Sequence, residues 1–303
     1  RLVTIRIGIV FNKMGGALAD QLTHFFKLNP IDRRMVLMAG ISAGFASVFG
    51  TPLAGAVFAL EVLAIGRLRL DALLPCVIAA VVADQVGLLW GVQHTPYEVG
   101  LVPPITAWLL AAMVVAGALF GLAGKVFADG THALSGAMKK HIAYAPLRPL
   151  LGGAVIAAVV VWGSFDRYIG LGIPVMLEAF AHPLAPTDFL GKMVFTIASL
   201  GSGFKGGEVT PLFYIGATLG NVLAPLLDVP FELLAAVGFV AVFAGAANTP
   251  IASTLMAVEL FGAEIGVFAA LACVMSYVCS GHSGIYRAQR VAHRKTEAPS
   301  PPS

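Results

Sequence analysis

The sequence predicts an all-α, polytopic membrane protein with an internal repeat and discontinuous helices. Three observations predict it: an apolar composition, apolar runs of membrane-spanning length, and two matching segments far apart in the chain. Hydrophobic residues make up 58% of the 303 residues and charged residues only 12%, with a net charge of +3. Soluble domains carry about 25% charged residues. This composition therefore excludes an ordinary soluble domain, and the small net charge does not indicate nucleic-acid binding.

Apolar runs divide the chain into candidate membrane helices. Long runs, most of them free of charged residues, occupy positions 35–60, 73–90, 105–124, 150–165 and 233–258, and each is about as long as a transmembrane helix. Shorter runs occupy positions 189–200, 212–227 and 267–278. Short apolar pieces interrupted by Gly and Pro are typical of the discontinuous helices of transporters. Buried re-entrant turns without a function would give the same pattern.

Positions 34–63 and 232–261 form an internal repeat, RMVLMAGISAGFASVFGTPLAGAVFALEVL and ELLAAVGFVAVFAGAANTPIASTLMAVELF. At a shift of 198 residues, both have small residues before a Thr-Pro pair and an apolar run that ends in glutamate. Proline favours the first helical position and Thr can cap the free amides, so each segment is predicted to be two helices joined at a break. A shift of 201 residues aligns MGGALADQL (14–22) with IGATLGNVL (215–223). Such two-fold repeats are typical of transporters, whose substrate site lies at the repeat interface.

Three acidic residues lie in or at the ends of these apolar runs. Glu61 and Glu259 each follow a Thr-Pro helix. They are interpreted either as proton-transfer or dimer-interface residues or, by preference, as helix-end charges that reach water. Asp84 lies inside an apolar run and is expected to be satisfied by a neighbouring group.

Four stretches together resemble the CLC family of chloride channels and proton-coupled anion antiporters. GISAGFASVFGTPLAGAVFALEVL is similar to the segment after the family's first anion motif, and GSGFKGGEVTP to its GxFxP motif. NTPIASTLMAVELF is similar to the matching segment of the second half, and GHSGIYRAQR to the last membrane helix. The resemblance covers nearly all of positions 14–290. It implies inverted-topology repeats, anion transport by a homodimer with one pathway per subunit, and an anion-path tyrosine at Tyr286.

Two departures from the chloride-transporting members favour the fluoride branch of the family, which exports fluoride against protons. The motif GEVTP lacks the aromatic residue of the chloride-type form, and Val62 stands where chloride antiporters carry an inner proton glutamate. The resemblance therefore implies fluoride export coupled to proton import. The alternative is a voltage-gated-type chloride channel or a chloride/proton antiporter of the same family.

The first residues of the chain depart from the family in another way. The gating glutamate of the family's GREGP or GREGT motif falls on Gly8, and the family's GSGIP motif has no counterpart here. The chain is therefore interpreted as N-terminally incomplete. A fragment that lacks transport activity is a further interpretation.

The stretch GSGFKGGEVTP is the predicted anion site. Its glycines let the backbone approach an ion closely, and amides at a helix start offer free N–H groups and a partial positive charge. The hydroxyl groups of Thr210 and of Tyr286, the tyrosine implied by the resemblance, add donors. Alternatively, Tyr286 is an interfacial tyrosine without a role in transport. The predicted anion-binding residues are Gly206, Gly207, Glu208, Val209, Thr210 and Tyr286.

Glu208 is also the predicted proton-coupling residue. Burial and a nearby anion both favour the protonated carboxyl, so its protonation can follow anion occupancy. Alternatively, Glu208 is structural, and pairs with Lys205 or caps a helix. Lys205 either raises the anion concentration at the entrance or places its ammonium at the interface without a further role.

Other motifs in the chain have weaker interpretations. GSGFKG fits the dinucleotide pattern GxGxxG but lacks the surrounding βαβ unit. GHSG fits the pattern of an intramembrane serine protease but lacks a histidine on a later helix, so we expect neither an enzyme nor a cofactor. The histidines have no metal-site spacing. The three cysteines lie in apolar runs and are predicted to be buried thiols: Cys76, Cys273 and Cys279.

The chain divides into five predicted parts: an atypical start (1–13), the rest of the first repeat half (14–72), linking membrane helices (73–200), the second repeat half (201–286) and a basic tail (287–303). Positive residues beside a span favour the cytoplasm, so the tail is placed there, and it is expected to be disordered, its Pro/Ser end above all. The predicted location is a bacterial-type inner or plasma membrane. The predicted partners are fluoride or chloride, protons, lipid and a second copy of the chain.

Overall fold

The computed structural model describes residues 2–66, 68–163, 165–286, 289–291 and 295, with side chains from residue 14 onward except at 290. The helices are α1 (Leu2–Phe25), α2 (Pro30–Phe49), α3 (Pro52–Glu61), α4 (Leu73–Leu89), α5 (Ala107–His141), α6 (Leu147–Gly163), α7 (Ile173–Ala181), α8 (Asp188–Gly201), α9 (Val209–Leu227), α10 (Phe231–Ala247), α11 (Pro250–Phe261) and α12 (Gly266–Cys279). Short 3-10 segments cover Leu70–Ala72 (η1), Asp166–Tyr168 (η2) and Ala263–Ile265 (η3). Two short strands, β1 (Ala64–Ile65) and β2 (Arg290–Val291), pair in parallel. The prediction of an all-α fold is confirmed.

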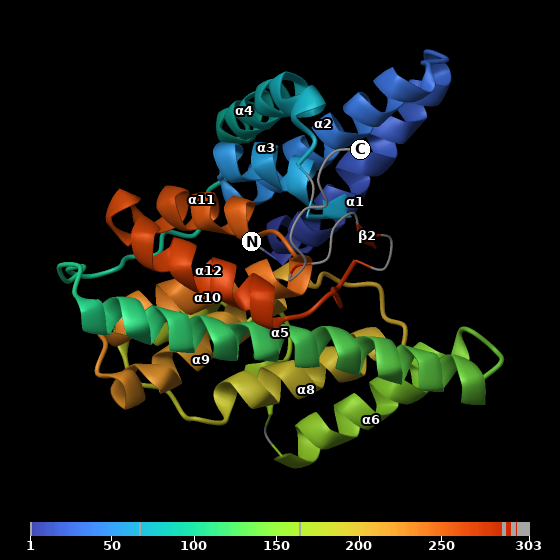
Figure 1. Ribbon diagram of the computed structural model, residues 1–303. Coiled ribbons are helices and arrows are strands. Elements are labelled where there is room, and N and C mark those ends of the chain that lie inside the picture. Colours follow the sequence, from blue (N-terminus) through green and yellow to red (C-terminus); the bar gives the residue numbers. More distant parts are fainter. Residues whose placement is uncertain (1, 67, 164, 287–288, 292–294, 296–303) are drawn as a thin grey trace.

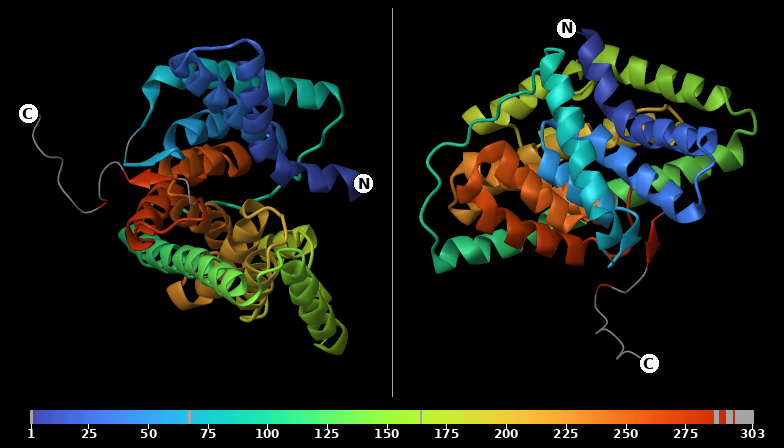
Figure 2. Two further views of the ribbon diagram at one scale, coloured as in Figure 1. Left: turned by 90° about the vertical axis from the view of Figure 1, so that its right-hand side faces the viewer. Right: turned by 90° about the horizontal axis from the view of Figure 1, so that it is seen from above.

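The helices are arranged in two layers. Helices α1–α4 form one layer and α5–α12 the other, and the long helix α5 crosses the second layer (Figure 1; Figure 2 shows the layers from the side). Helices α3 and α11 pack against each other where the layers meet. The two predicted Thr-Pro helices therefore lie side by side, although they are far apart in the chain.

The predicted breaks before both Thr-Pro helices are confirmed. Gly50 and Asn248 end α2 and α10 with left-handed backbones, at φ 66° and 58°. The next residues have nearly the same backbone, with φ −129° and ψ 76° at Thr51 and φ −131° and ψ 66° at Thr249. The sequence repeat is thus a repeat of structure at the break itself.

Two pairs of glycines give the halves the same helix packing. A Cβ atom at Gly15 would overlap the carbonyl oxygen of Gly40, where α1 crosses α2. The matching positions are Gly216 and Gly238, where a Cβ atom would overlap in the same way between α9 and α10. Only glycine allows backbones to approach this closely. The match of MGGALADQL with IGATLGNVL therefore marks equivalent helix contacts.

The glutamate at the end of each Thr-Pro helix caps the start of the other Thr-Pro helix. Both carboxylate oxygens of Glu61 accept backbone N–H bonds from the first turn of α11, at 3.1 and 2.9 Å. Both oxygens of Glu259 accept such bonds from the first turn of α3, each at 2.8 Å. Glu61 is only 8% exposed. The preferred interpretation of helix-end charges that reach water is therefore wrong for Glu61, whose buried carboxylate binds the amides of the other helix. Glu259 is half-buried and binds amides in the same way.

The threonines before the two prolines do not make the predicted caps. Neither Thr51 nor Thr249 accepts a capping hydrogen bond on its side chain. Both hydroxyl groups are buried and have no hydrogen-bond partner among the described residues. The prediction of a Thr cap was wrong because the glutamate of the other half occupies the same amides.

Two further predictions for individual residues have different outcomes. Asp84 is buried, and its carboxylate accepts a bond from the Gln85 side chain at 3.2 Å, as expected. Cys76 and Cys273 are buried free thiols, but Cys279 is exposed. The prediction for Cys279 was wrong because it lies at the last residue of α12, where the helix reaches the protein surface.

Burial differs sharply between helices. Helix α10 is buried without interruption from Leu233 to Ala247 and lies at the centre of the core. Helix α6, in contrast, has no buried residue although it is strongly apolar. Among the described residues, Leu70–Leu89, Ala107–His141 and Val209–Leu227 are long and apolar enough to span a membrane. Apolar side chains on the outside are suited to contact with lipid.

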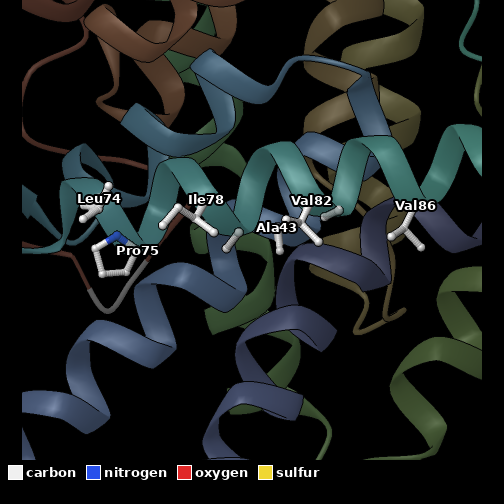
Figure 3. A pocket seen from close by; sticks show the side chains of 8 residues that line it. Ala43, Leu74, Pro75, Ile78, Val82 and Val86 are labelled. Carbon is white, nitrogen blue, oxygen red and sulfur yellow. The ribbon is translucent and has the colours of Figure 1, made fainter.

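A groove beside α4 is apolar throughout (Figure 3). Its side chains come from α4 and from one alanine of α2: Ala43, Leu74, Pro75, Ile78, Ala79, Val82, Ala83 and Val86. None of them carries a hydrogen-bond donor for an anion. The candidate site therefore lies elsewhere, at the start of α9.

Candidate anion site

Helix α9 begins at the predicted place, directly after GSGFKGGE. Glu208 is the residue before its first turn, with φ −97° and ψ −22°, and its side chain does not cap the helix. The amides of the first turn, which an anion can use as donors, are therefore not bound by the Glu208 side chain. The structural alternative in which Glu208 caps its own helix is wrong.

Exposure changes along this stretch from the surface to the interior. Lys205 and Gly206 are exposed, Glu208 and Thr210 are half-buried, and Val209 is buried. A Cβ atom at Gly206 would meet only a leucine methyl at an ordinary contact distance of 3.7 Å. The stretch thus leads from an open, glycine-lined surface to the first turn of a buried helix.

Tyr286 lies close to this helix start although it comes from the segment after α12. The Glu208 carboxyl lies within electrostatic range of the Tyr286 hydroxyl. The Tyr286 ring also makes an edge contact with Phe58 of α3, with ring centroids 6.3 Å apart. The structure thus brings together the two predicted parts of the site and adds Phe58, which sequence analysis missed. The roles of these residues in transport stay predictions.

Aromatic rings fill the space behind the site. Phe58 stacks with Phe45 of α2 at 4.4 Å and with Phe243 of α10 at 5.9 Å. Phe213, in the second turn of α9, stacks on Phe239 at 4.2 Å. Phe45 and Phe243 occupy equivalent positions at the repeat shift of 198 residues. The repeat was the one sequence signal that pointed to this cluster.

A second cluster of charged side chains packs against Tyr214 of α9. Lys192, in α8, is 1% exposed, and its ammonium donates to the carbonyl oxygens of Tyr168 and Gly170 at 3.1 and 2.6 Å. It lies 5.1 Å from the centre of the Tyr214 ring, a cation–π contact with α9. Sequence analysis missed this cluster, because Lys192 lies in an apolar run without a charged neighbour that pairs with it.

Arg167 joins the same cluster through two carboxylates. Its guanidinium forms ion pairs with Asp188 at 3.0 Å and with Glu178 at 2.9 Å. The hydrogen bond to Asp188, above all, raises the pKa of Arg167. These pairs tie the segment before α7 to the start of α8, and so fix the bundle that carries α9.

The GHSG motif lies against helix α5. The Ser283 hydroxyl donates to the Asp129 carboxylate of α5. The Nε2 atom of His132 meets the Gly284 carbonyl oxygen at 2.8 Å. Since the serine faces a carboxylate, the enzyme alternative gains no support from this arrangement.

The tail after Tyr286 is partly built into the fold. Strand β2 pairs with β1 directly after α3, which is an exception to the disorder expected for this tail. The Lys295 ammonium donates to Asn248 Oδ1 at 2.6 Å, the Tyr277 carbonyl at 2.5 Å and Ser280 Oγ at 3.1 Å. Burial lowers the pKa of Lys295 to about 8. Residues 287–288, 292–294 and 296–303 of the predicted tail lie outside the described residues.

Comparison with known proteins identifies the family. Residues 10–281 match the model of the voltage-gated chloride channel family. The chain belongs to this family, the CLC proteins. It is an integral membrane protein with the inverted-repeat, all-α CLC fold, as predicted.

Individual relatives and solved structures agree with this assignment. A chloride/fluoride channel protein of Pseudomonas syringae pv. tomato is 64% identical over 296 residues, which is 95% of this chain and 65% of the relative. The voltage-gated ClC-type chloride channel ClcB of Escherichia coli O9:H4 is 30% identical over 86% of this chain and 65% of its own length. The crystal structure of a CLC-type fluoride/proton antiporter superposes with a TM-score of 0.90 and 34% identity, and covers 93% of this chain and 72% of that one. The chain spans about two thirds of the length of these relatives.

Proposed function

We propose that the protein containing this chain exports fluoride across the bacterial plasma membrane in exchange for protons. The observation that carries the proposal is the start of α9, where Glu208 stands directly before the first turn and near Tyr286. The motif GEVTP and the resemblance to a fluoride/proton antiporter support fluoride as the anion. The 64% identical relative is named a chloride/fluoride channel protein, which supports the same anion.

Fluoride suits a site made of such donors. It is small, and it gives up a strong hydration shell on leaving water, so it needs several short hydrogen bonds in return. In the proposed site, the amides of Val209 and Thr210, the Thr210 hydroxyl and the Tyr286 hydroxyl supply these bonds. These donors carry no full charge, so the ion can also leave.

In the proposed cycle, Glu208 links the two fluxes. A bound fluoride repels the Glu208 carboxylate and therefore favours its protonated form. While the site is open to the outside, the carboxyl takes this proton from the outer solution and the fluoride leaves outward. The empty site then favours the carboxylate, which releases the proton to the cytoplasm. Each cycle would thus exchange one outgoing fluoride for an incoming proton at one titrating group.

Fluoride export is tested by ion flux from liposomes. Vesicles containing the purified protein are loaded with fluoride or chloride, and efflux is followed with a fluoride or chloride electrode together with the internal pH. We expect fluoride efflux to acidify the vesicles, with chloride moving much more slowly. Chloride efflux at an equal or higher rate would instead support the second candidate, a chloride channel, which is favoured by the 30% identical relative named ClcB.

Proton coupling by Glu208 is tested by Glu208→Gln in the same assay. The amide keeps the shape of the side chain but cannot titrate, so fluoride should move with at least a tenfold smaller proton flux per ion. Glu264→Gln is the matched control, because Glu264 is an exposed glutamate of η3. Unchanged proton coupling in the Glu208 variant would remove its assigned role.

The orientation and assembly of the protein also belong to the proposal. The basic residues after Tyr286 favour a cytoplasmic tail, and the family resemblance favours a homodimer. A single cysteine placed at Ser303 in a cysteine-free background should react with a membrane-impermeant reagent in inside-out vesicles only. Reaction in right-side-out vesicles would reverse the orientation.

A further inference from the structure

The segment from Gly281 to Tyr286 connects α12 to the candidate site. It leaves the end of α12 through a left-handed glycine, Gly281, with φ 69°. It then runs against α5 on one side and against the end of α10 on the other. We call residues 281–286 the tyrosine segment, because its last residue is Tyr286. Its path decides where that ring lies.

Two side chains of α5 hold the tyrosine segment. Asp129 accepts the hydrogen bond from the Ser283 hydroxyl, and His132 Nε2 meets the carbonyl oxygen of Gly284 at 2.8 Å. A carbonyl oxygen accepts only, so this contact makes His132 the donor and places its proton on Nε2. Asp129 and His132 are three residues apart and therefore lie on one face of α5.

The end of α10 leaves the same segment little freedom on its other side. The Ile285 amide donates to the Ala246 carbonyl oxygen at 2.9 Å. A Cβ atom at Gly284 would lie 2.6 Å from the Asn248 side-chain nitrogen and 3.1 Å from Gln289 Oε1. The backbone at Gly284 is therefore pressed between α5 and α10, two residues before Tyr286.

We propose that Asp129 and His132 are positioning residues that set the place of Tyr286 in the anion path. They act through Ser283 and Gly284 and do not touch the anion. The proposal rests on the proposed function, since it assigns them to the anion site formed by Tyr286 and the start of α9. It also gives the GHSG motif a role, because the serine and the second glycine are the points of attachment.

The physical reason lies in the number of donors that meet one small ion. If Tyr286 moves by about 1 Å, its hydroxyl leaves hydrogen-bonding distance. The amides at the start of α9 are fixed by a buried helix and cannot follow. Loosening the tyrosine segment should therefore weaken anion binding more than it slows the transport step.

The test compares variants that keep or remove each attachment, in purified protein reconstituted into liposomes. His132→Leu removes the donor, whereas His132→Gln keeps an N–H near the position of Nε2. Ser283→Ala removes the hydroxyl, whereas Ser283→Thr keeps it. Lys139→Gln is the control for a changed charge on the same helix, because Lys139 is exposed in the last turn of α5. Each variant is measured alone and combined with Tyr286→Phe.

We expect His132→Leu and Ser283→Ala each to raise the fluoride concentration for half-maximal transport about three- to tenfold, with a smaller change in maximal rate. The Gln and Thr variants should restore at least half of the loss. In the Tyr286→Phe background the same substitutions should have no further effect, because the hydroxyl that they position is gone. Hydrogen exchange of the peptide covering 281–291 should be faster in His132→Leu than in the control.

Three results would overturn the proposal. One is an equal loss with and without the Tyr286 hydroxyl, which would indicate a purely structural role. The second is a loss confined to the maximal rate. The third is unchanged hydrogen exchange in His132→Leu. If Tyr286→Phe alone transports fluoride like the wild type, the assigned role of Tyr286 in the proposed function fails instead, and chloride selectivity in the wild type would refute fluoride export.

Discussion

The two halves of the repeat share one backbone plan but occupy different surroundings. In both, a glycine pair brings two helices together, a left-handed residue ends the second helix, and a Thr-Pro helix follows. In the second half, however, α9 and α10 are buried almost throughout, whereas most described side chains of α1 are exposed and most of those of α2 are half-buried. The comparison teaches that the repeat sets the geometry of the helices, whereas the burial of its two copies within this chain differs.

The left-handed residues show how the neighbours differ. Gly50 ends α2 beneath the ring of His94, which would lie 2.7 Å from a Cβ atom at this position. Asn248 ends α10, and its side chain binds Gln289 at 3.0 Å and Lys295 at 2.6 Å. At Gly50 the His94 ring leaves no room for a side chain, so this position requires glycine. At Asn248, in contrast, the side chain binds residues that follow Tyr286 in the chain.

The largest expected difference between the halves concerns the glycine pairs. Gly216→Ala should reduce the free energy of unfolding by about 3 kcal/mol, because the new methyl group meets a carbonyl oxygen inside a buried bundle. Gly15→Ala meets a similar oxygen, but α1 is largely exposed and can shift, so about 1 kcal/mol is expected. Denaturant unfolding in detergent, followed by tryptophan fluorescence, measures both. Equal losses would contradict the view that surroundings distinguish the halves.

The reciprocal caps should give the next largest effect. Glu61→Gln is expected to cost about 2 kcal/mol of stability and Glu259→Gln about 1 kcal/mol, because Glu61 is more deeply buried. The same unfolding measurement is used, with Glu264→Gln as the control for an exposed glutamate. If Glu259→Gln reduced the free energy of unfolding more than Glu61→Gln, burial of the carboxylate would not explain the difference between the two caps.

The left-handed positions predict a smaller asymmetry. Gly50→Ala should lose about 1–2 kcal/mol, since alanine is strained at φ 66° and its methyl group meets His94. Asn248→Gly should lose less than about 1 kcal/mol, because relief of backbone strain offsets the lost side-chain hydrogen bonds. Thermal unfolding of the two variants, side by side with the wild type, gives the ranking. A reversed order would show that the side chain of Asn248 matters more than its backbone.

Lys295 gives the smallest effect, and it depends on pH. At pH 7 the ammonium is protonated in the folded and the unfolded chain. Between its folded pKa of about 8 and the ordinary value of about 10.4, the unfolded chain holds a proton that the folded chain has lost. Stability therefore rises with pH in this window.

Lys295→Met removes this contribution. The midpoint of thermal unfolding of the wild type, relative to that of the variant, should rise by on the order of 1 °C between pH 7 and pH 9.5. If the difference in unfolding midpoint between the wild type and the variant stayed constant over this range, the buried, hydrogen-bonded position of Lys295 would be contradicted. The effect is specific to the second half, because Lys295 binds the side chain of Asn248 and the equivalent residue of the first half, Gly50, has no side chain.

Much of the fold follows from the sequence, because the repeat and the Thr-Pro pairs have direct physical meanings. The breaks at Thr51 and Thr249 and the start of α9 after Glu208 were predicted within one or two residues. Proline fixes the first turn of a helix, and glycine lets backbones meet. These rules act locally, so they can be applied without knowing the neighbours.

The sequence did not predict the partners of individual side chains. Glu61 and Glu259 end apolar helices, and nothing near them in the chain shows that they cap helices in the other half. His132 was missed because a lone histidine in a long helix carries no signal until Gly284 is placed against it. Partners that are far apart in the chain are set by the three-dimensional arrangement, which one sequence without its relatives does not contain.

The reciprocal caps also set an order of events during synthesis. Glu61 binds amides that come 190 residues later in the chain, and Glu259 binds amides 206 residues earlier. At about 5–20 residues per second, the ribosome needs roughly 10–40 s to make the stretch between them. During that interval the first turn of α3 has no carboxylate to bind and Glu61 has no amides to receive it. The nascent first half must therefore wait in the membrane with an open helix end and an unpaired charge until the second half arrives.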